Sequence, residues 1–224
     1  MWQSLALVAL ALVPVLAAGA AGHPDAEVAL EVLEPARPGF VPEAAPSRFV
    51  LQGDGRVLVG GTSHIASGQL DKLETREIEK LVSVVRKLPG LGSSVTLGPG
   101  ETQYRLWLKR GQGLEIVAKG DPAGAPQALR PLAELLERLS GFNHATLVPL
   151  MATQFVVSAR EERLDGGCRQ WTLPPPLADV LVGPRLVTAQ AASGWPSGAI
   201  AASVCAGEKR YSVTLRPLMP DERP

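Results

Sequence analysis

A β-hairpin followed by an amphipathic helix occurs twice in the middle of this 224-residue chain, and this repeat limits the possible folds more than any other feature. In the first unit, two β-prone runs (49–52 and 56–60) flank the turn Gly53-Asp54-Gly55, which is typical of a hairpin. A helix that begins with Thr75 as its cap is then predicted. Its apolar positions recur at helical spacing and form one stripe, which consists of Ile78, Leu81, Val82, Val85 and Leu88.

The same order of elements recurs between residues 102 and 140. Residues 102–109 alternate in polarity, a turn follows at 111–113, and residues 114–118 provide the returning strand. A second helix is predicted near 127–140, and because proline suits only the first turn of a helix, its regular part is expected to start near Pro131. Its apolar stripe consists of Leu129, Leu132, Ala133, Leu136 and Leu139.

The two units together predict the fold class. Each helix has one apolar face, and each hairpin needs cover on one side, so packing helices on a sheet satisfies both. We therefore predict an α+β fold in which residues 47–141 form a tandem hairpin–helix domain, with a four-stranded antiparallel sheet and both helices on one face. The preceding residues 23–46 are rich in Pro, Ala and Glu and indicate a linker, although 28–33 could add an edge strand.

Residues 142–224 predict a second, smaller α+β region. Strands are expected at 154–158 and 185–189, a short helix at 177–182, and a closing hairpin from 199–205 and 210–216. The two cysteines of the chain, Cys168 and Cys205, both fall here. In an oxidising compartment such a pair favours a disulfide, which would stabilise the fold by roughly 4 kcal/mol. The alternatives are a metal site, which lacks nearby histidines, and a redox pair, which lacks the Cys-x-x-Cys spacing.

The first 22 residues have the pattern of a secretory signal peptide. The apolar run 5–13 is followed by small residues at 17–22, where cleavage is expected. The run is too short to span a bilayer comfortably, and no later segment is long and apolar enough to do so. We therefore predict a secreted, periplasmic or cell-envelope protein. The alternative is that the N-terminus remains as an anchor or forms a buried helix.

The segment 49–57, the helix after it and the C-terminal residues resemble a group of secreted proteins from high-GC bacteria that has no assigned biochemical function. The most specific element is the tail Arg-Pro-Leu-x-Pro-Asp-Glu, here residues 216–222, while the Gly-Asp-Gly hairpin is common. The resemblance covers most of the chain after the signal. It implies export and a shared fold and brings no catalytic residues. Many members look like lipoproteins, whereas no cysteine occurs here before Cys168.

The predicted function is a non-catalytic binding or interaction module. Lys plus Arg and Asp plus Glu are both 22, which argues against nucleic acid as a partner because that partner requires a basic patch. No P-loop, calcium loop, Gly-x-Ser-x-Gly motif or metal cluster is present in the sequence, so no cofactor and no metal are expected. Trp171 and Trp195, in proline-rich loops, are the candidate contact surface for a protein or an envelope ligand. The alternative is that both indoles are buried against the disulfide.

Two other functions compete with this prediction. One is a secreted hydrolase that uses His64, which has Asp71 and serines nearby in sequence, or His144, which follows the second helix. A non-catalytic interpretation is also open for each histidine. His64 would be a solvated loop residue, and His144 would interact with the C-terminal end of the second helix. The other is an inhibitor-like protein that blocks an extracellular enzyme with the loop 193–198.

Overall fold

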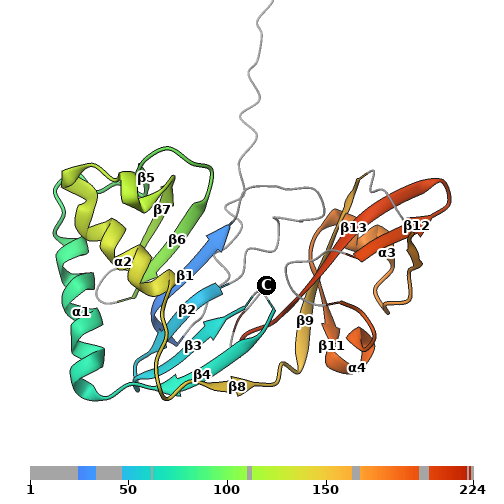
Figure 1. Cartoon of the computed structure of the whole chain (residues 1–224), viewed down its shortest axis with the longest axis horizontal. Helices are drawn as coiled ribbons and strands as arrows, with labels where there is room; N and C mark the ends of the chain where they lie inside the picture. The colour runs from blue at the N-terminus through green and yellow to red at the C-terminus, as the bar shows by residue number, and fades with distance from the viewer. Residues whose placement is uncertain are drawn as a thin grey trace, which may run out of the picture.

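The computed structural model describes residues 25–33, 47–61, 63–109, 113–162, 167–196, 202–220 and 222. The predicted signal peptide therefore lies outside the described residues. The described chain forms two β-sheets with helices packed on them, which confirms the α+β fold class (Figure 1). Within these ranges, none of the helices has the length and apolar character needed to cross a membrane.

The N-terminal sheet has eight strands, of which the hairpin–helix units supply only part. All neighbours pair antiparallel except β5 and β7. In spatial order the strands are β5 (Ser94–Thr96), β7 (Leu114–Lys119), β6 (Gln103–Leu108), β1 (Ala26–Leu33), β2 (Ser47–Gln52), β3 (Arg56–Gly60), β4 (Ile65–Gln69) and β8 (Val148–Leu150).

Strand β1 corrects the first part of the predicted linker 23–46, of which residues 23–24 and 34–46 lie outside the described residues. It pairs with β2 on one side and with β6 on the other, so it joins the two hairpins at the centre of the sheet instead of extending an edge. Apolar side chains on both of its faces explain this place, because a central strand with covered faces needs them. Val28, Leu30 and Val32 face the helices, and Ala29 faces the opposite side. A second correction concerns residues 61–72, predicted as a loop, in which β4 forms the next strand after β3.

Helices α1 (Lys72–Arg86) and α2 (Arg130–Ser140) lie side by side on one face of this sheet (Figure 1). The cap of α1 is Asp71 and not Thr75, because the Asp71 carboxylate accepts hydrogen bonds from the backbone N–H groups of Leu73 and Glu74. The Glu74 side chain in turn accepts from the Asp71 N–H, which completes a capping box. Pro131 lies in the first turn of α2, as predicted, after the short 3-10 turn Gln127–Leu129.

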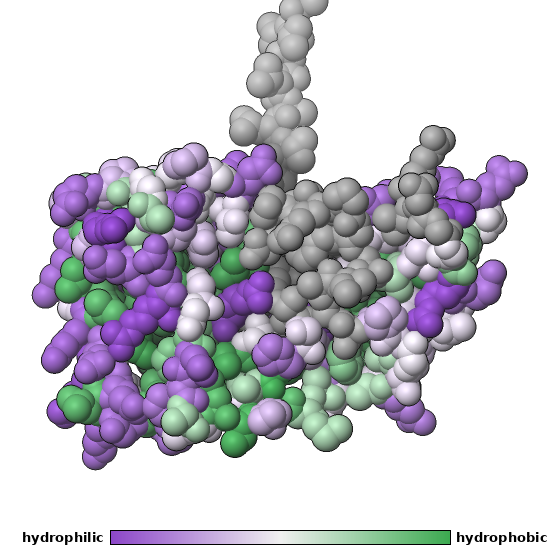
Figure 2. Space-filling view, in the orientation of Figure 1, coloured by the Kyte–Doolittle hydropathy of each residue, from purple (hydrophilic) through white to green (hydrophobic). Residues whose placement is uncertain are grey.

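The apolar stripes of both helices point into one core with the sheet. Ile78, Val82 and Val85 of α1 are buried there, and Leu81 and Leu88 pack at its margin. The turn between β2 and β3 requires a glycine, because Gly55 has a φ of +85° and its N–H donates to the carbonyl oxygen of Gln52. Figure 2 shows hydrophilic side chains over the outer surface of the two helices and hydrophobic ones gathered over β4 and β8.

The C-terminal sheet has five strands and a core of its own. In spatial order they are β10 (Arg169–Gln170), β12 (Ala202–Ala206), β13 (Lys209–Pro217), β9 (Gln154–Glu161) and β11 (Arg185–Thr188). The helices α3 (Leu177–Val182) and α4 (Ala189–Ala192) cover the apolar face of this sheet, where Val157, Val204 and Leu215 are buried. The opposite face carries buried polar side chains, among them Ser158, Ser212 and Arg216.

Candidate functional site

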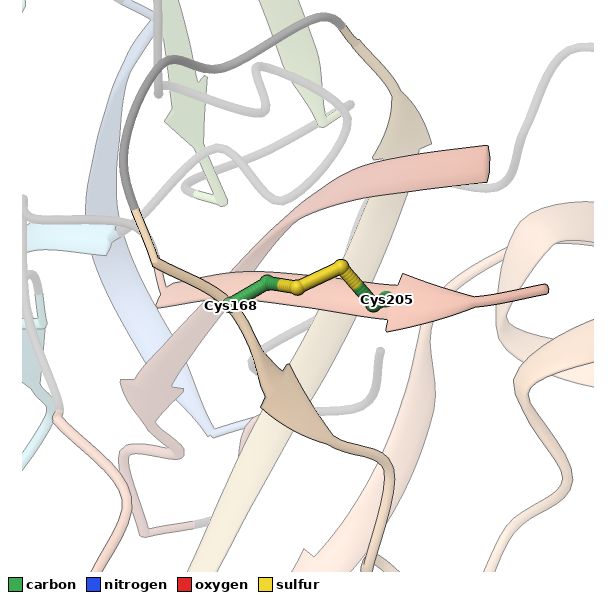
Figure 3. Close-up of a disulfide and its surroundings, with 2 residues drawn as sticks. All are labelled: Cys168 and Cys205. Atoms are coloured by element: carbon green, nitrogen blue, oxygen red, sulfur yellow. A yellow bond between two sulfur atoms is a disulfide. The ribbon is translucent and has the colours of Figure 1, made fainter. Parts of the chain in front are cut away.

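The disulfide between Cys168 and Cys205 fixes the edge of the C-terminal sheet (Figure 3). It joins the residue before β10 to β12, and β10 pairs parallel to β12 through Arg169 and Gln170. A strand of two residues has too few hydrogen bonds to hold its place alone. The predicted disulfide is confirmed. Because β10 is so short, the bond is what positions the segment that carries Arg169 and Trp171.

Trp171 and Trp195 meet beside this edge although they are 24 residues apart in the chain. Their ring centroids lie 5.6 Å apart at an interplanar angle of 71°, an edge-to-face contact. Trp171 Nε1–H donates to the carbonyl oxygen of Pro175 at 2.8 Å, and Trp195 Nε1–H donates to Thr172 Oγ1 at 3.0 Å. Both indole donors are thus satisfied within the protein, so the rings offer an outside ligand their faces and edges.

Arg169 completes the arrangement, which we call the aromatic cluster (Arg169, Trp171 and Trp195). Its guanidinium carbon lies 4.8 Å from the centroid of the Trp195 ring, a cation–π contact, and its Nη1 donates to the carbonyl oxygen of Gly194 at 3.0 Å. Arg169 is exposed, whereas both tryptophans are half-buried and pack at the margin of the C-terminal core. The sequence left open whether the two indoles are exposed for contact or buried. In the structure each indole packs against the core and keeps part of its surface exposed.

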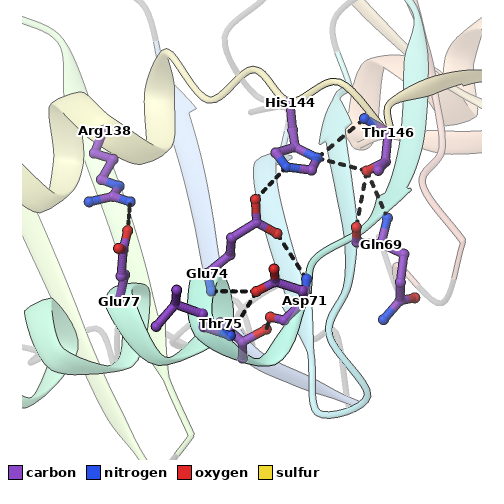
Figure 4. Close-up of polar contacts among 9 residues, drawn as sticks. Gln69, Asp71, Glu74, Thr75, Glu77, Arg138, His144 and Thr146 are labelled. Carbon is purple, nitrogen blue, oxygen red and sulfur yellow. Dashed lines mark hydrogen bonds and ion pairs between the residues drawn. The ribbon is translucent and has the colours of Figure 1, made fainter.

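A second group of polar side chains connects α1 to the segment before β8 (Figure 4). His144 Nε2 lies 2.7 Å from Glu74 Oε1, and His144 Nδ1 lies 2.7 Å from Thr146 Oγ1. The Asp71 backbone N–H and the hydrogen bond with His144 hold the pKa of the Glu74 carboxyl below its usual value. Thr146 Oγ1 also accepts from the backbone N–H of Gln69 and donates to its carbonyl oxygen, both at 3.1 Å. The group therefore joins the start of α1 to the end of β4.

A cavity of about 380 Å³ lies beside this group. Leu70, Ile78 and Phe142 supply apolar lining, and Glu74, Glu77 and His144 supply polar lining. Across it, Arg138 of α2 donates to Glu77 of α1 at 3.1 Å. The cavity thus lies between the two helices, with His144 and its partner Glu74 in its wall.

The other predicted site residues do not converge. His64 is exposed and its Nδ1 lies 3.1 Å from Ser63 Oγ, its sequence neighbour, while Asp71 is engaged in capping α1. A Ser–His–Asp grouping around His64, which the alternative hydrolase function would need, therefore has no support among these contacts. In the inhibitor-like loop 193–198, residues 193–196 follow α4, and 197–198 lie outside the described residues. Within the described ranges, no three His, Cys, Asp or Glu side chains are grouped so that they could hold a metal ion.

Sequence reasoning missed two polar groups that the fold assembles. Glu74 and His144 are 70 residues apart, and nothing in their spacing signals a contact. Glu31 of β1 and Glu222 near the C-terminus are both buried, and Arg216 pairs with Glu222. The sequence did carry a signal for the second group. Arg216 and Glu222 lie close enough in the charged C-terminal segment 216–222 to pair locally.

Comparison with protein-family models, with curated proteins and with solved structures gives no match for this chain.

Proposed function

We propose that this chain is an exported, non-catalytic binding protein and that the aromatic cluster is its contact surface for a protein or an envelope ligand. The observation that carries the proposal is the preorganised state of the cluster. Both indole N–H groups are satisfied internally, the rings are fixed against each other, and Arg169 is stacked on Trp195 at the surface. Tryptophan and arginine held in this way lose little conformational freedom on binding and are frequent in binding hot spots.

The disulfide supports the export part of this proposal. Disulfides persist mainly in oxidising compartments such as the periplasm and the cell exterior. The signal-like residues 1–22 and the resemblance to secreted proteins of high-GC bacteria point the same way. A mass of the protein recovered from outside the cytoplasm tests this directly. We expect a chain that starts near residue 21 to 23, whereas a full-length chain with free thiols would contradict export.

A retention experiment tests the binding surface. Purified protein is immobilised and incubated with the envelope and secreted fractions of the cell that makes it, and retained material is quantified. We expect Arg169→Glu and Trp195→Leu to reduce retention about tenfold, since each removes an anchor of the cluster and a tenfold loss corresponds to about 1.4 kcal/mol.

Lys80→Glu is the matched control, because it makes the same charge reversal at an exposed position of α1 in the other sheet domain. Equal retention by wild type, Arg169→Glu and Lys80→Glu would remove the cluster as the contact surface.

The Glu74–His144–Thr146 group favours a second candidate function, the hydrolysis of an acyl bond. In that reaction Thr146 Oγ1 would attack the carbonyl carbon, His144 Nδ1 would take the hydroxyl proton and pass it to the leaving group, and Glu74 would hold the Nε2–H; water would then release the acyl group from Thr146. The two hydrogen bonds with the backbone of Gln69 oppose this role, because Thr146 Oγ1 accepts from the N–H and donates to the carbonyl oxygen, which anchors the hydroxyl in a structural position.

Hydrolysis of p-nitrophenyl acetate distinguishes the two functions. We expect the same background rate from wild type, His144→Gln and Thr146→Val. A wild-type rate well above that of both variants would favour the hydrolase instead.

A further inference from the structure

After β13 the chain passes from the C-terminal sheet to the face of the N-terminal sheet that lies away from the helices (Figure 1). We call residues 217–220 and 222 the tail. Leu218 N–H donates to the carbonyl oxygen of Gln154 at 2.9 Å, which holds the tail at the start of β9. Met219 is only 1% exposed and packs among Ala29, Val50 and Leu58, on the side of the N-terminal sheet away from the helices. The tail therefore connects the two sheets through a buried apolar side chain.

One carboxylate folds the tail into this position. Glu222 accepts hydrogen bonds from both terminal nitrogens of Arg216, with Nη1 at 3.1 Å, and from the backbone N–H of Met219 at 2.9 Å. Its side chain is fully buried. A charge-assisted pair with two parallel hydrogen bonds has a defined geometry, so the position of Met219 depends on this pair.

Glu31 of β1 adds a third charged side chain to the buried group. It is 7% exposed, and Arg105 of β6 donates to it at 3.1 Å. Arg105 also lies 3.3 Å from Glu115 of β7. Burial raises the pKa of Glu31 to about 7 against the opposing effect of Arg105; the charge of Glu222 raises it further and that of Arg216 lowers it. Glu31 therefore changes its charge close to neutral pH.

The charge balance of the group depends on that change. The charges of Arg105, Glu222 and Arg216 act on Glu31, and Glu115 lies beside Arg105. Arg105 and Glu115 are half-exposed, so the buried members of the group are Glu31, Arg216 and Glu222, and with Glu31 protonated Arg216 balances Glu222. With Glu31 ionised, these three buried side chains carry one excess negative charge, which the half-exposed Arg105 offsets only in part, and burying such a charge is costly.

Polar side chains on the C-terminal sheet also favour withdrawal of the tail. The Oγ atoms of Ser158 and Ser212 and the Nε atom of Arg216 are buried without a hydrogen-bond partner. These residues lie on the same face of β9 and β13. A buried polar atom without a partner destabilises the closed arrangement, and water that enters when the tail withdraws removes this cost.

We propose that the tail is a clasp between the two sheets, closed when Glu31 is neutral and opened when Glu31 is ionised. In the closed state Met219 is inserted against β1, β2 and β3 and Glu222 is buried beside Glu31. Ionisation of Glu31 repels Glu222, withdraws the tail and exposes Met219 to solvent. The inference is independent of the proposed binding function, since it involves the opposite side of the C-terminal sheet from the aromatic cluster.

Oxidation of methionine by hydrogen peroxide tests the clasp. Met219 is the buried probe, and Met151, which is 92% exposed, is the internal reference for reagent and pH. The rates of sulfoxide formation at both residues are measured by peptide mass spectrometry at pH 5.5 and pH 8.5. We expect the ratio of the Met219 rate to the Met151 rate to rise at least fivefold at the higher pH in the wild type. Glu31→Gln, which keeps the shape and cannot ionise, should give the low ratio at both pH values.

Glu27→Gln is the matched control, because it makes the same change in the same strand, at a side chain that pairs with Lys109. It should behave like the wild type. Glu222→Gln should raise the Met219 ratio even at pH 5.5, because the amide is a weaker partner for Arg216. Near-UV circular dichroism at both pH values verifies that each protein is folded. A wild-type ratio that does not change with pH, or the same change in Glu31→Gln, would overturn the proposal.

Discussion

Trp171 and Trp195 illustrate how far single residues of this chain depend on a covalent bond nearby. The disulfide holds β10 against β12, and Arg169 and Trp171 follow Cys168 directly. Trp195 contacts the same segment through the cation–π contact with Arg169 and the hydrogen bond from its Nε1–H to Thr172 Oγ1. The aromatic cluster is therefore a consequence of the disulfide as much as of the aromatic residues themselves.

Removing the disulfide should loosen the cluster and destabilise the fold. For the double variant Cys168→Ala/Cys205→Ala we expect a loss of about 2–4 kcal/mol in the free energy of unfolding, because the unfolded chain gains conformational freedom. Urea denaturation measures the loss, and acrylamide quenching of tryptophan fluorescence should increase while the protein is still folded. Stability and quenching equal to those of the wild type would show that β10 holds its place without the bond.

At the level of elements, the strongest local patterns were sufficient to predict structure. The hairpins β2–β3 and β6–β7, the helices α1 and α2 and the short helix α3 all form where the periodicity and the turns predicted them. The same patterns failed for β1 and β4. The strand β1 lies in a segment flanked by prolines that resembles a linker, and β4 (Ile-Ala-Ser-Gly-Gln) has little β propensity of its own. Both are strands because neighbours offer them hydrogen bonds and cover, which no local pattern records.

The start of α1 provides a test at this level. Asp71→Ala removes the side-chain acceptor for two backbone N–H groups and half of the capping box, so we expect a loss of about 1–2 kcal/mol in the free energy of unfolding. Thermal and urea denaturation measure this loss. Glu134→Ala, at an exposed position within α2, is the control and should change stability by less than about 0.5 kcal/mol. Similar effects of the two substitutions would contradict the role of Asp71.

The candidate site was predictable only in part, and for a related reason. Cysteine count predicted the disulfide and the proline-rich loops drew attention to Trp171 and Trp195, whereas the contact of Arg169 with the Trp195 ring requires the fold. His144 was selected as a candidate for catalysis or helix interaction. Its partners Glu74 and Thr146 emerge only when α1, β4 and the segment before β8 are assembled.

For the whole molecule, buried Glu31 predicts how stability depends on pH. Its pKa is about 7 in the folded protein and 4.5 in the unfolded chain, so the folded state binds the proton more tightly. The resulting stabilisation is complete below pH 4.5, decreases as the pH rises, and is lost once the pH has passed about 7. From this group alone we expect the free energy of unfolding to be up to about 3 kcal/mol lower at pH 8 than at pH 4.5.

Chemical denaturation of wild type and Glu31→Gln over this pH range measures the effect. The difference in stability between the two proteins should grow in favour of Glu31→Gln as the pH rises from 5 to 8. Glu27→Gln should instead follow the pH dependence of the wild type. Parallel curves for wild type and Glu31→Gln would contradict the burial of an ionisable Glu31.

We propose that the chain binds its partner through the aromatic cluster. Nitrogen-15 labelling of the tryptophan indoles tests it most directly, because each indole N–H gives its own resonance and Trp107, half-buried on the N-terminal sheet, is an internal reference. The labelled protein is titrated with a solubilised envelope extract and with the concentrated secreted fraction. Changes in shift or line width at Trp171 and Trp195, with Trp107 unaffected, are the predicted result. Changes confined to Trp107, or none at any indole with material that is shown to bind the protein, would contradict the claim.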